Sequence, residues 1–278
     1  MEKRSLRIAG VVAGAVAAAA TVSAGVVYAL RKYEPRLFPR TAFGWALAFN
    51  AYDAVGEPVR LFVVNGTVQS GTYKGARRYD LPFEYYRAID RVVHEANLAS
   101  GHLLVLGGGG YAYPKHVIAH TDAASVDVVE IDSIVTRIAR RWFYLDDLMR
   151  EFKTEQTGRL HLIRADALSF MRYTTSTYDV IVDDVFAAGT PDLALVCEDG
   201  AQAAHNLLNA GGLYIANVVT PEGELSVLQA TVENLSREFA QVSVIPCTDN
   251  ELSDDDNYLV VATDGSYEFT GAITQHFG

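Results

Sequence analysis

The sequence predicts an α/β protein with a mostly parallel, doubly wound sheet, a small β-region before it and an apolar helix at the N-terminus. Three observations lead to this prediction. From residue 83 onward, short apolar segments alternate with stretches of helical spacing, a pattern typical of parallel sheets covered by helices on both faces. One of these segments runs directly into four glycines. The first forty residues contain a long uncharged run.

The composition is that of a large folded chain. Half of the 278 residues are hydrophobic and 21% are charged, which is enough for a sizeable core and excludes a disordered chain. The two cysteines, Cys197 and Cys247, form no CxxC motif, so they indicate neither a disulfide framework nor a zinc site. The net charge of −11 argues against a nucleic-acid partner.

Residues 1–40 differ in charge from the rest, because they hold seven of the 23 Lys and Arg residues but only two of the 34 Asp and Glu residues. Residues 8–30 carry no charge, and as a helix they would span about 34 Å, more than a bilayer core of about 30 Å. We therefore expect residues 1–40 to form a single-pass cell-membrane anchor. A cleaved signal peptide is the alternative, since Val22-Ser23-Ala24 resembles a cleavage site. Basic residues flank both ends, so the positive-inside rule only slightly favours a cytoplasmic body.

The remaining elements are expected in two blocks. Residues 41–82 form a small β-region, in which Asn65-Gly66 between two β-branched runs is a strong hairpin signal. Residues 83–278 form the main domain, and the polar acidic stretch before its last strand predicts an antiparallel closing hairpin. The strands expected in that domain are 102–106, 126–130, 160–164, 178–182, 213–217, 242–246 and 257–262, and the main helices 83–96, 134–143, 200–209 and 224–239.

Ligands of open α/β sheets bind at the carboxyl ends of the strands, where two features first stand out. The glycines at 107–110 follow the first core strand and allow a ligand to approach the backbone closely, although a tight strand-to-helix turn is the alternative. Glu130 ends the second strand, with Asp132 two residues on. A carboxylate at this position can accept hydrogen bonds from both hydroxyls of a ribose, although solvated loop acids are common.

Acids also end the third and fourth strands. Asp166 can accept a hydrogen bond from the exocyclic amine of adenine, cap the following helix, or do both. Asp183 and Asp184 are adjacent, and two buried neighbouring acids are costly, so they indicate a site that holds or deprotonates an amine. The pattern Gly107-x-Gly109-x-x-Ala112 also fits an NAD site. Strand ends that carry acids suit an adenosine with a cationic sulfonium better than a pyrophosphate.

These motifs, taken in order, resemble the spermidine synthase (polyamine aminopropyltransferase) family over residues 45–265. The segments that carry the resemblance are LVLGGGG (104–110), VEID (129–132), RADALSF (164–170) and YDVIVDD (178–184), with VNGTVQS (64–70) upstream. The resemblance implies a class I methyltransferase-like Rossmann domain behind a small β-domain. It implies transfer of an aminopropyl group from decarboxylated S-adenosylmethionine to an amine acceptor.

The resemblance also implies roles for individual residues. Gln69 would face the aminopropyl side of the cofactor, Glu130 the ribose and Asp166 the adenine, and Asp184 would orient or deprotonate the amine. The expected cofactor-binding set is Gln69, Gly107, Gly108, Gly109, Glu130, Asp166 and Ala167. The expected substrate pocket is Tyr86, Tyr111 and Asp183, and Tyr85 also lies near the expected mouth of the site. Core or domain packing is an equal alternative for the three tyrosines.

Two departures from the family pattern keep other functions open. Gly110 stands where the family has an acid that helps to hold the aminopropyl ammonium, and Ala187 stands at the family's second acid after Asp184. The pattern from Gly107 to Pro114 is similar to that of a bacterial spermidine-synthase-like subgroup, often membrane-associated. Methyl transfer from S-adenosylmethionine and a non-catalytic, membrane-tethered adenosyl-binding module are therefore alternatives. The family also makes a homodimer possible, and a cytosolic cofactor favours a cytoplasmic body.

Two smaller features are expected to be structural. His116 and His120 stand one helical turn apart, but no third ligand accompanies them, so we expect no metal site. The acidic run at residues 254–256 is expected to be a solvated loop rather than a rim that attracts cations.

Overall fold

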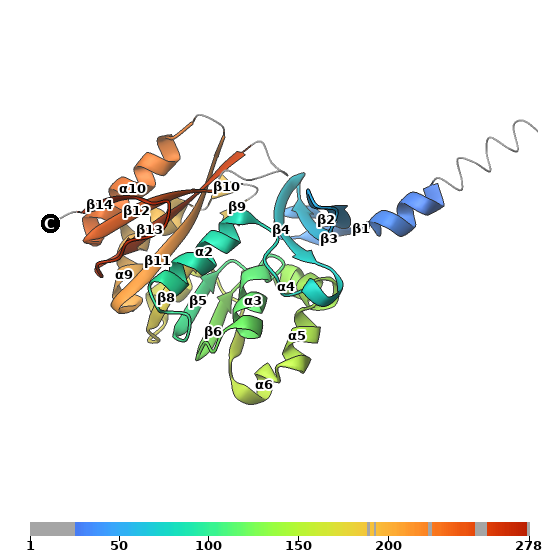
Figure 1. The fold of residues 1–278 in the computed structure, drawn as a ribbon, viewed down its shortest axis with the longest axis horizontal. Coiled ribbons are helices and arrows are strands. Elements are labelled where there is room, and N and C mark those ends of the chain that lie inside the picture. The colour runs from blue at the N-terminus through green and yellow to red at the C-terminus, as the bar shows by residue number, and fades with distance from the viewer. Residues whose placement is uncertain (1–25, 188–189, 192, 222–223, 248–254, 277–278) are drawn as a thin grey trace, which may run out of the picture.

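The computed structural model describes residues 26–187, 190–191, 193–221, 224–247 and 255–276. A helix over residues 26–33 projects from the body of the molecule (Figure 1). Within the described ranges, no helix has the length and apolar character needed to cross a membrane. Most of the predicted anchor at residues 8–30 lies outside the described residues.

A small antiparallel sheet follows the projecting helix. Its strands β1 (Arg36–Thr41), β2 (Gly44–Tyr52), β3 (Pro58–Val64) and β4 (Thr67–Tyr73) are arranged in chain order. The expected hairpin joins β3 to β4, and both residues of its turn, Asn65 and Gly66, have positive φ. The sheet begins before the expected boundary at residue 41. Most side chains of β1 are exposed, as on an edge strand, so this strand lacks the alternating pattern that would reveal it.

The main sheet has eight strands, in the order β14-β12-β13-β11-β8-β5-β6-β7. Neighbours from β11 to β7 pair in parallel, whereas β13, β12 and β14 form an antiparallel edge, as the closing hairpin predicted. The strands are β5 (His102–Leu106), β6 (Ser125–Val129), β7 (Leu160–Ile163), β8 (Tyr178–Asp183), β11 (Leu208–Pro221), β12 (Gln241–Cys247), β13 (Asp255–Thr263) and β14 (Ile273–His276).

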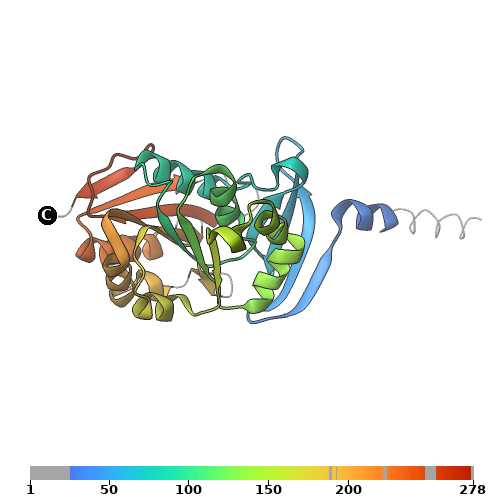
Figure 2. The same cartoon turned by 90° about the horizontal axis from the view of Figure 1, so that it is seen from below.

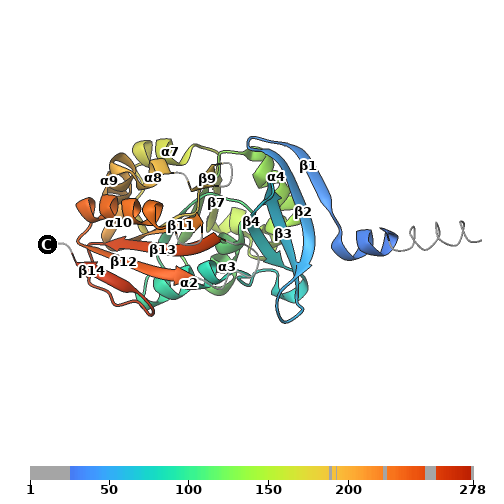
Figure 3. The same cartoon turned by 90° about the horizontal axis from the view of Figure 1, so that it is seen from above.

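Helices cover both faces of this sheet (Figures 2 and 3). One face carries α2 (Glu84–Glu95), α3 (Ala112–His120), α4 (Ser133–Trp142), α5 (Leu145–Glu151) and α6 (Thr154–Thr157). The other carries α7 (Ala167–Tyr173), α8 (Leu193–Val196), α9 (Glu198–Leu207) and α10 (Ser226–Glu238). The 3₁₀ turn η1 (Gly75–Arg77) follows β4, and the ribbon β9 (Phe186–Ala187) and β10 (Thr190–Pro191) follows β8. The buried residues form one large cluster on each face.

The small sheet packs over the carboxyl ends of the parallel strands and shares their core. Phe62 of β3 contacts Phe143 edge to face, with ring centroids 5.7 Å apart. The backbone N–H of Ala42 donates to the carboxylate of Asp132, just beyond β6, at 2.6 Å. Arg60 donates to the carbonyl of Trp142 at 3.0 Å. The two sheets therefore enclose the edge at which ligands of this fold bind.

Candidate active site

A cavity of about 160 Å³ lies between the small sheet and the carboxyl ends of the parallel strands. Its wall includes every residue predicted to bind the cofactor, together with the predicted catalytic acid: Gln69, Gly107, Gly108, Gly109, Glu130, Asp166, Ala167 and Asp184. Apolar side chains such as Phe43, Val64 and Val135 complete it. A concave, mostly apolar site with a few converging polar groups is typical of small-molecule binding.

The glycine loop is shaped by close backbone approach. Gly107 has a φ of +91°, and a Cβ atom there would collide with the backbone oxygen of Asp184. The N–H of Gly107 donates to the carbonyl of Val129, and that of Asp184 donates to the carbonyl of Leu106, both at 2.9 Å. These bonds hold the ends of β5, β6 and β8 together. The backbone of Asp184 then leaves no room for a side chain at position 107, so only glycine fits there.

Glu130 lies behind the glycine loop and is 8% exposed. One carboxylate oxygen accepts from the N–H groups of Gly108 at 2.9 Å and Gly109 at 3.4 Å, and the other accepts from that of Asp132 at 2.8 Å. Burial raises the pKa of Glu130, against the lowering effect of these N–H donors. A carboxylate can accept about four hydrogen bonds, so Glu130 retains capacity for a ribose hydroxyl.

The two other acids near these strand ends act differently. Asp132 caps α4 through the N–H of Ile134 at 2.8 Å, and its second oxygen holds the small sheet at Ala42. Asp166 caps α7 through the N–H of Ser169 at 2.9 Å and also lines the cavity. The two predicted roles of Asp166, helix cap and ligand contact, are thus compatible in one residue.

The carboxyl group of Asp184 is surrounded by hydrogen-bond donors rather than by cations. Oδ1 accepts from Asn217 Nδ2 at 2.8 Å, and Oδ2 accepts from the hydroxyl of Tyr86 at 3.3 Å. Burial raises the pKa of Asp184 to about 7, while hydrogen bonds from Asn217, Tyr86 and Tyr85 oppose this rise. A carboxyl group that titrates near neutral pH can exchange a proton with a bound amine.

Asp183 turns away from its neighbour. Its carboxylate accepts from the hydroxyl of Tyr214 at 2.7 Å and from the N–H of Val185 at 3.3 Å, and it is absent from the cavity wall. Successive residues of an extended strand point to opposite sides, which separates the two acids that the sequence places together. The position of Asp183 is therefore that of a structural acid and not of a pocket residue.

The two tyrosines predicted for the substrate pocket also lie off this wall. Tyr86 stands behind Asp184, with its hydroxyl 3.3 Å from both Asp184 Oδ2 and Ser70 Oγ. Tyr111 is 1% exposed, and its hydroxyl lies 2.9 Å from Thr136 Oγ1. Its ring packs so close to Gly108 that a Cβ atom there would lie 2.7 Å from it, so Tyr111 occupies a core position.

The structure adds Asn217 to the site and shows where Tyr85 lies. Asn217 is the last residue of the segment expected as the fifth core strand. Its place at a strand end could have identified it as a site residue from the sequence. Tyr85 lines a second cavity, of about 180 Å³, and its ring centroid is 4.1 Å from that of Tyr86. Asn257 of β13 lines the same second cavity and donates to Asn217.

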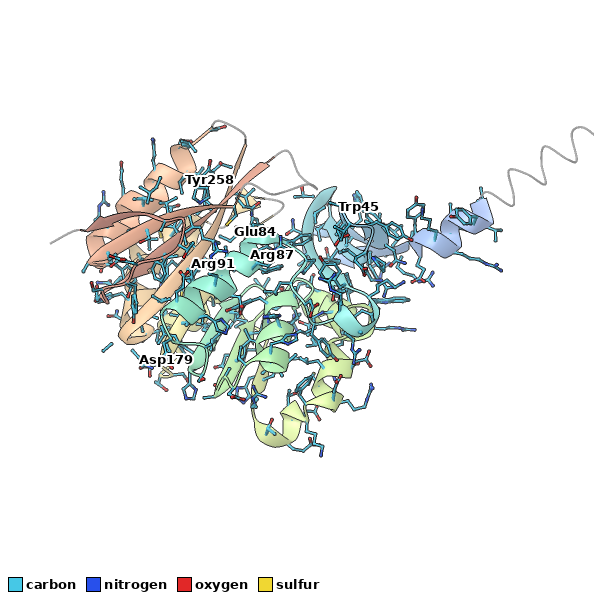
Figure 4. All side chains as sticks on the ribbon, viewed as in Figure 1. Trp45, Glu84, Arg87, Arg91, Asp179 and Tyr258 are labelled. Carbon is cyan, nitrogen blue, oxygen red and sulfur yellow. The ribbon has the colours of Figure 1, made fainter. Side chains whose placement is uncertain are left out.

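The second cavity lies between the start of α2, the β2–β3 turn and the ends of β12 and β13. It has aromatic and charged walls, including Tyr73, Phe83, Glu84 and Arg87. Figure 4 shows Glu84 and Arg87 along α2, next to the strands that close the sheet. Tyr85 on this wall packs against Tyr86, whose hydroxyl donates to the carboxyl group that lines the first cavity.

The histidine pair lies against a backbone carbonyl, and part of the acidic run expected as a loop is in a strand. His116 contacts the carbonyl of Tyr79 at 3.0 Å, and its ring centroid is 4.6 Å from that of His120. Across the described residues, no group of three or more His, Cys, Asp or Glu side chains could hold a metal ion. Asp254 lies outside the described residues, and Asp255 and Asp256 begin β13.

Comparisons with known proteins agree with this architecture. The chain is 29% identical over 158 residues to a polyamine aminopropyltransferase of Pseudomonas syringae pv. tomato, an alignment that covers 57% of this chain and 54% of the relative. The chain thus spans about half the length of the curated relatives it matches.

Solved structures share the fold. A probable spermidine synthase from Corynebacterium glutamicum superposes with a TM-score of 0.68 at 19% identity, covering 87% of this chain and 90% of that one. Human methyltransferase-like protein 13 gives a TM-score of 0.52 at 21% identity, with 67% and 84% coverage. Both the small β-domain and the methyltransferase-like sheet therefore have counterparts of known structure.

The family model described as the spermine/spermidine synthase domain matches residues 82–253, more than half of the 278-residue chain. This match includes the glycine loop, Glu130, Asp166 and Asp184. The chain therefore belongs to the spermine/spermidine synthase family.

Proposed function

We propose that this protein is a polyamine aminopropyltransferase, which transfers the aminopropyl group of decarboxylated S-adenosylmethionine to an amine acceptor. The observation that carries the proposal is the position of Asp184. Its carboxyl group lines the cavity that holds the predicted adenosyl-binding residues. It also accepts a hydrogen bond from Tyr86, whose ring centroid is 4.1 Å from that of Tyr85 on the wall of the second cavity. The co-substrate is assigned to the first cavity and the acceptor to the second.

The residues of the first cavity suit an adenosine. The glycine loop offers bare backbone, Glu130 retains acceptor capacity beside it, and Asp166 lies at the end of the next strand. Gln69 enters from the small sheet and would face the aminopropyl side. Ala167, next to Asp166, leaves room for a flat ring. These positions match the order in which a methyltransferase-like sheet presents its residues to ribose and base.

The reaction is a displacement at carbon. The neutral amine nitrogen attacks the aminopropyl carbon bound to the sulfonium, the new N–C bond forms as the C–S bond breaks, and the electron pair goes to sulfur. Methylthioadenosine leaves uncharged, and the proton of the new ammonium group passes to Asp184. Because Asp184 titrates near neutral pH, it can both hold an amine and accept that proton.

Methyl transfer from intact S-adenosylmethionine is the second candidate, and the surroundings of Gly110 favour it. A Cβ atom at Gly110 would lie 2.8 Å from Ser70 Oγ and 3.2 Å from the ring of Phe143. The acid that the family uses at this position to hold the ammonium group therefore does not fit here without displacement of Ser70. Recognition of an aminopropyl ammonium group then falls to other residues.

Titration calorimetry with decarboxylated S-adenosylmethionine, S-adenosylmethionine and methylthioadenosine separates these functions. We expect the decarboxylated form to bind at least about tenfold more tightly than the intact form, since binding free energies that differ by 1.4 kcal/mol give a tenfold ratio. Mass spectrometry should detect methylthioadenosine and an aminopropylated diamine. Methyl transfer instead would favour the second candidate, and binding without any turnover would favour a non-catalytic adenosyl-binding module.

We also propose that residues 1–40 anchor the protein in the cell membrane, with the body in the cytoplasm. Support comes from the helix over residues 26–33, where Val26, Val27, Tyr28 and Leu30 are 47–66% exposed in continuation of the uncharged run. Carbonate should fail to extract the full chain from membranes, and protease added outside intact cells should leave the body uncut. Release into the soluble fraction would contradict the anchor.

A homodimer is a further expectation of the family resemblance. Leu37 and Trp45 of the small sheet are 64% and 45% exposed, and a second copy could bury them. Figure 4 shows Trp45 on the small sheet, at the end from which the N-terminal helix projects. Light scattering of the detergent-solubilised chain measures the mass, and a monomer across the micromolar range would contradict the expectation.

A further inference from the structure

Three side chains form a linear series of hydrogen bonds that ends on Asp184. Asn257 Nδ2 donates to Asn217 Oδ1 at 2.9 Å, and Asn217 Nδ2 donates to Asp184 Oδ1 at 2.8 Å. Both asparagines are buried, with exposed fractions of 5% for Asn217 and 6% for Asn257. They come from β11 and β13, the two strands that follow β8 in the sheet order. Asn257 pairs with Val219, two residues from Asn217, so the two asparagines lie diagonally on the same face of the sheet.

The carboxamide of Asn217 has one donating end and one accepting end. Its oxygen receives the N–H of Asn257, and its amino group faces Asp184. An ionised carboxylate can only accept hydrogen bonds, so this orientation favours the ionised form. The reversed carboxamide would set two oxygens against each other unless Asp184 were protonated. The direction of the amide at 217 is therefore coupled to the charge at 184.

We propose that Asn257, acting through Asn217, is a positioning residue that keeps the carboxylate of Asp184 ionised and fixed in orientation for proton transfer. This assignment rests on the proposed function for its catalytic meaning. Neither asparagine is on the wall of the first cavity, and the series reaches Asp184 from the opposite side to the glycine loop.

The other groups that face Asp184 do not replace this series. Tyr86 of α2 donates to the carboxylate, Tyr85 packs against Tyr86, and burial raises the pKa of both phenols. Asp183 faces Tyr214 instead. Within the described part of the chain, no ion pair is formed by Asp184. Since burial already raises the pKa of Asp184 to about 7, a lost donor would change the ionised fraction near neutral pH.

The first test is the pH profile of kcat/KM for the full chain and for Asn257→Leu. We expect the acidic limb of the variant to move upward by about one pH unit, the size expected for a lost hydrogen bond to a charged group. The ratio of kcat/KM between the two proteins should narrow as the pH rises toward 9, because Asp184 is ionised there in both.

Two further variants control for packing. Asn257→Gln keeps the amide, and the second cavity beside it has room for one more methylene, so its acidic limb should stay in place. Asn50→Leu removes another buried asparagine, which is bonded to Arg60 on the small sheet, and should lower stability without moving the limb. A limb that stays put in Asn257→Leu while the KM for the amine rises would make Asn257 a substrate contact and overturn the proposal.

A second measurement requires no turnover. The thermal unfolding midpoint is followed from pH 5 to 9 for Asn257→Leu in the unsubstituted chain and in the Asp184→Asn background. The folded chain loses stability as the pH rises until Asp184 is fully ionised. A higher folded-state pKa at Asp184 extends this loss to higher pH, so the unfolding midpoint of Asn257→Leu should show an extra decrease between about pH 6 and 9. This decrease should vanish in the Asp184→Asn background.

The two measurements distinguish failure of the proposed function from failure of the positioning role. If the chain transfers no aminopropyl group but the pH-dependent decrease is present and depends on Asp184, the proposed function fails and the positioning role stands. If transfer occurs and the decrease is absent or persists in Asp184→Asn, the positioning role is overturned.

Discussion

The carboxyl group of Asp184 is buried with no cation beside it among the described residues, and this environment determines when it is protonated. Its pKa, raised to about 7, means that the folded chain binds a proton between about pH 4 and 7 that the unfolded chain releases. The free energy of unfolding contributed by this group therefore falls as the pH rises through that window. At pH 8 the ionised group is a net cost to folding and, in the proposed reaction, the active form of the base.

The substitution Asp184→Asn should separate function from stability. We expect it to lower aminopropyl transfer by at least about 10²-fold, as for loss of a general base, and to raise the melting temperature at pH 8 more than at pH 5. Transfer assays and differential scanning fluorimetry at both pH values check this. Unchanged turnover would remove Asp184 from the proposed catalytic role, and an equal decrease of the melting temperature at both pH values would contradict its raised pKa.

Glu130 is the residue on which adenosyl binding should depend most. In Glu130→Gln the amide cannot satisfy the N–H groups of Gly108, Gly109 and Asp132 as a carboxylate does. We expect about tenfold to 100-fold weaker binding of methylthioadenosine by calorimetry, since a hydrogen bond to a charged group contributes about 1.5–3 kcal/mol. Glu198→Gln, on the exposed start of α9, is the matched control and should bind normally.

At the scale of single elements, α3 carries a buried lysine between the two sheets. Lys115 is fully buried, and its ammonium group donates to Thr72 Oγ1 at 3.0 Å and to the carbonyl of Phe143 at 2.5 Å. No ion pair is found for it among the described residues. Burial lowers its pKa to about 7. Through this side chain, α3 is hydrogen-bonded to β4 and to the end of α4. Burial favours the neutral amine form of the lysine.

This lysine predicts a pH-dependent stability. Between about pH 7 and 10 the unfolded chain binds a proton that the folded chain does not, so the free energy of unfolding should rise by about 1.4 kcal/mol per pH unit from this group. Lys115→Met should lack that rise, whereas Lys153→Met, at an exposed position, should retain it. Urea unfolding at pH 7, 8 and 9 measures the slopes. Parallel slopes in Lys115→Met and the unsubstituted chain would contradict the prediction.

The elements show where sequence patterns are informative. Strands β5, β6, β8 and β12 fall within a residue or two of their expected ranges, because each is an apolar run bounded by polar or glycine residues. Strand β11 begins at Leu208, earlier than expected, since pairing with β8 extends it back through a glycine pair that reads as a turn. Strand β14 was missed because it is short and depends on the edge of β12 for its hydrogen bonds.

Over the whole molecule, the small sheet and the main sheet share one core. Ala46, Ala48, Phe62 and Val64 of the small sheet belong to the same buried cluster as the helices on one face of the main sheet. The small sheet also has a separate, smaller cluster of Val59, Leu61 and Tyr73, and the boundary expected at residue 83 stays a prediction.

We therefore expect the described body to unfold in one cooperative step. Scanning calorimetry should give a single transition whose van't Hoff and calorimetric enthalpies agree. Asp132→Ala, which removes both the cap of α4 and the bond to Ala42, should lower the midpoint without splitting the peak. Two resolved transitions, with the small sheet melting first, would show that the shared core does not couple the two sheets.

The sequence by itself determined the α/β class, the antiparallel closing edge and the residues at the strand ends, because periodicity and glycine placement are local properties of the chain. Glu130, Asp166 and Asp184 were placed on one site by the rule that parallel strands present their carboxyl ends together, and Gln69 by the family resemblance. Only the tertiary structure decided which way each side chain points. It turned Asp183 to Tyr214 and set Tyr111 in the core. It brought Asn257, 73 positions beyond Asp184 in the chain, within two hydrogen bonds of that carboxylate. Such contacts depend on strand register and packing between distant segments, which no local pattern records.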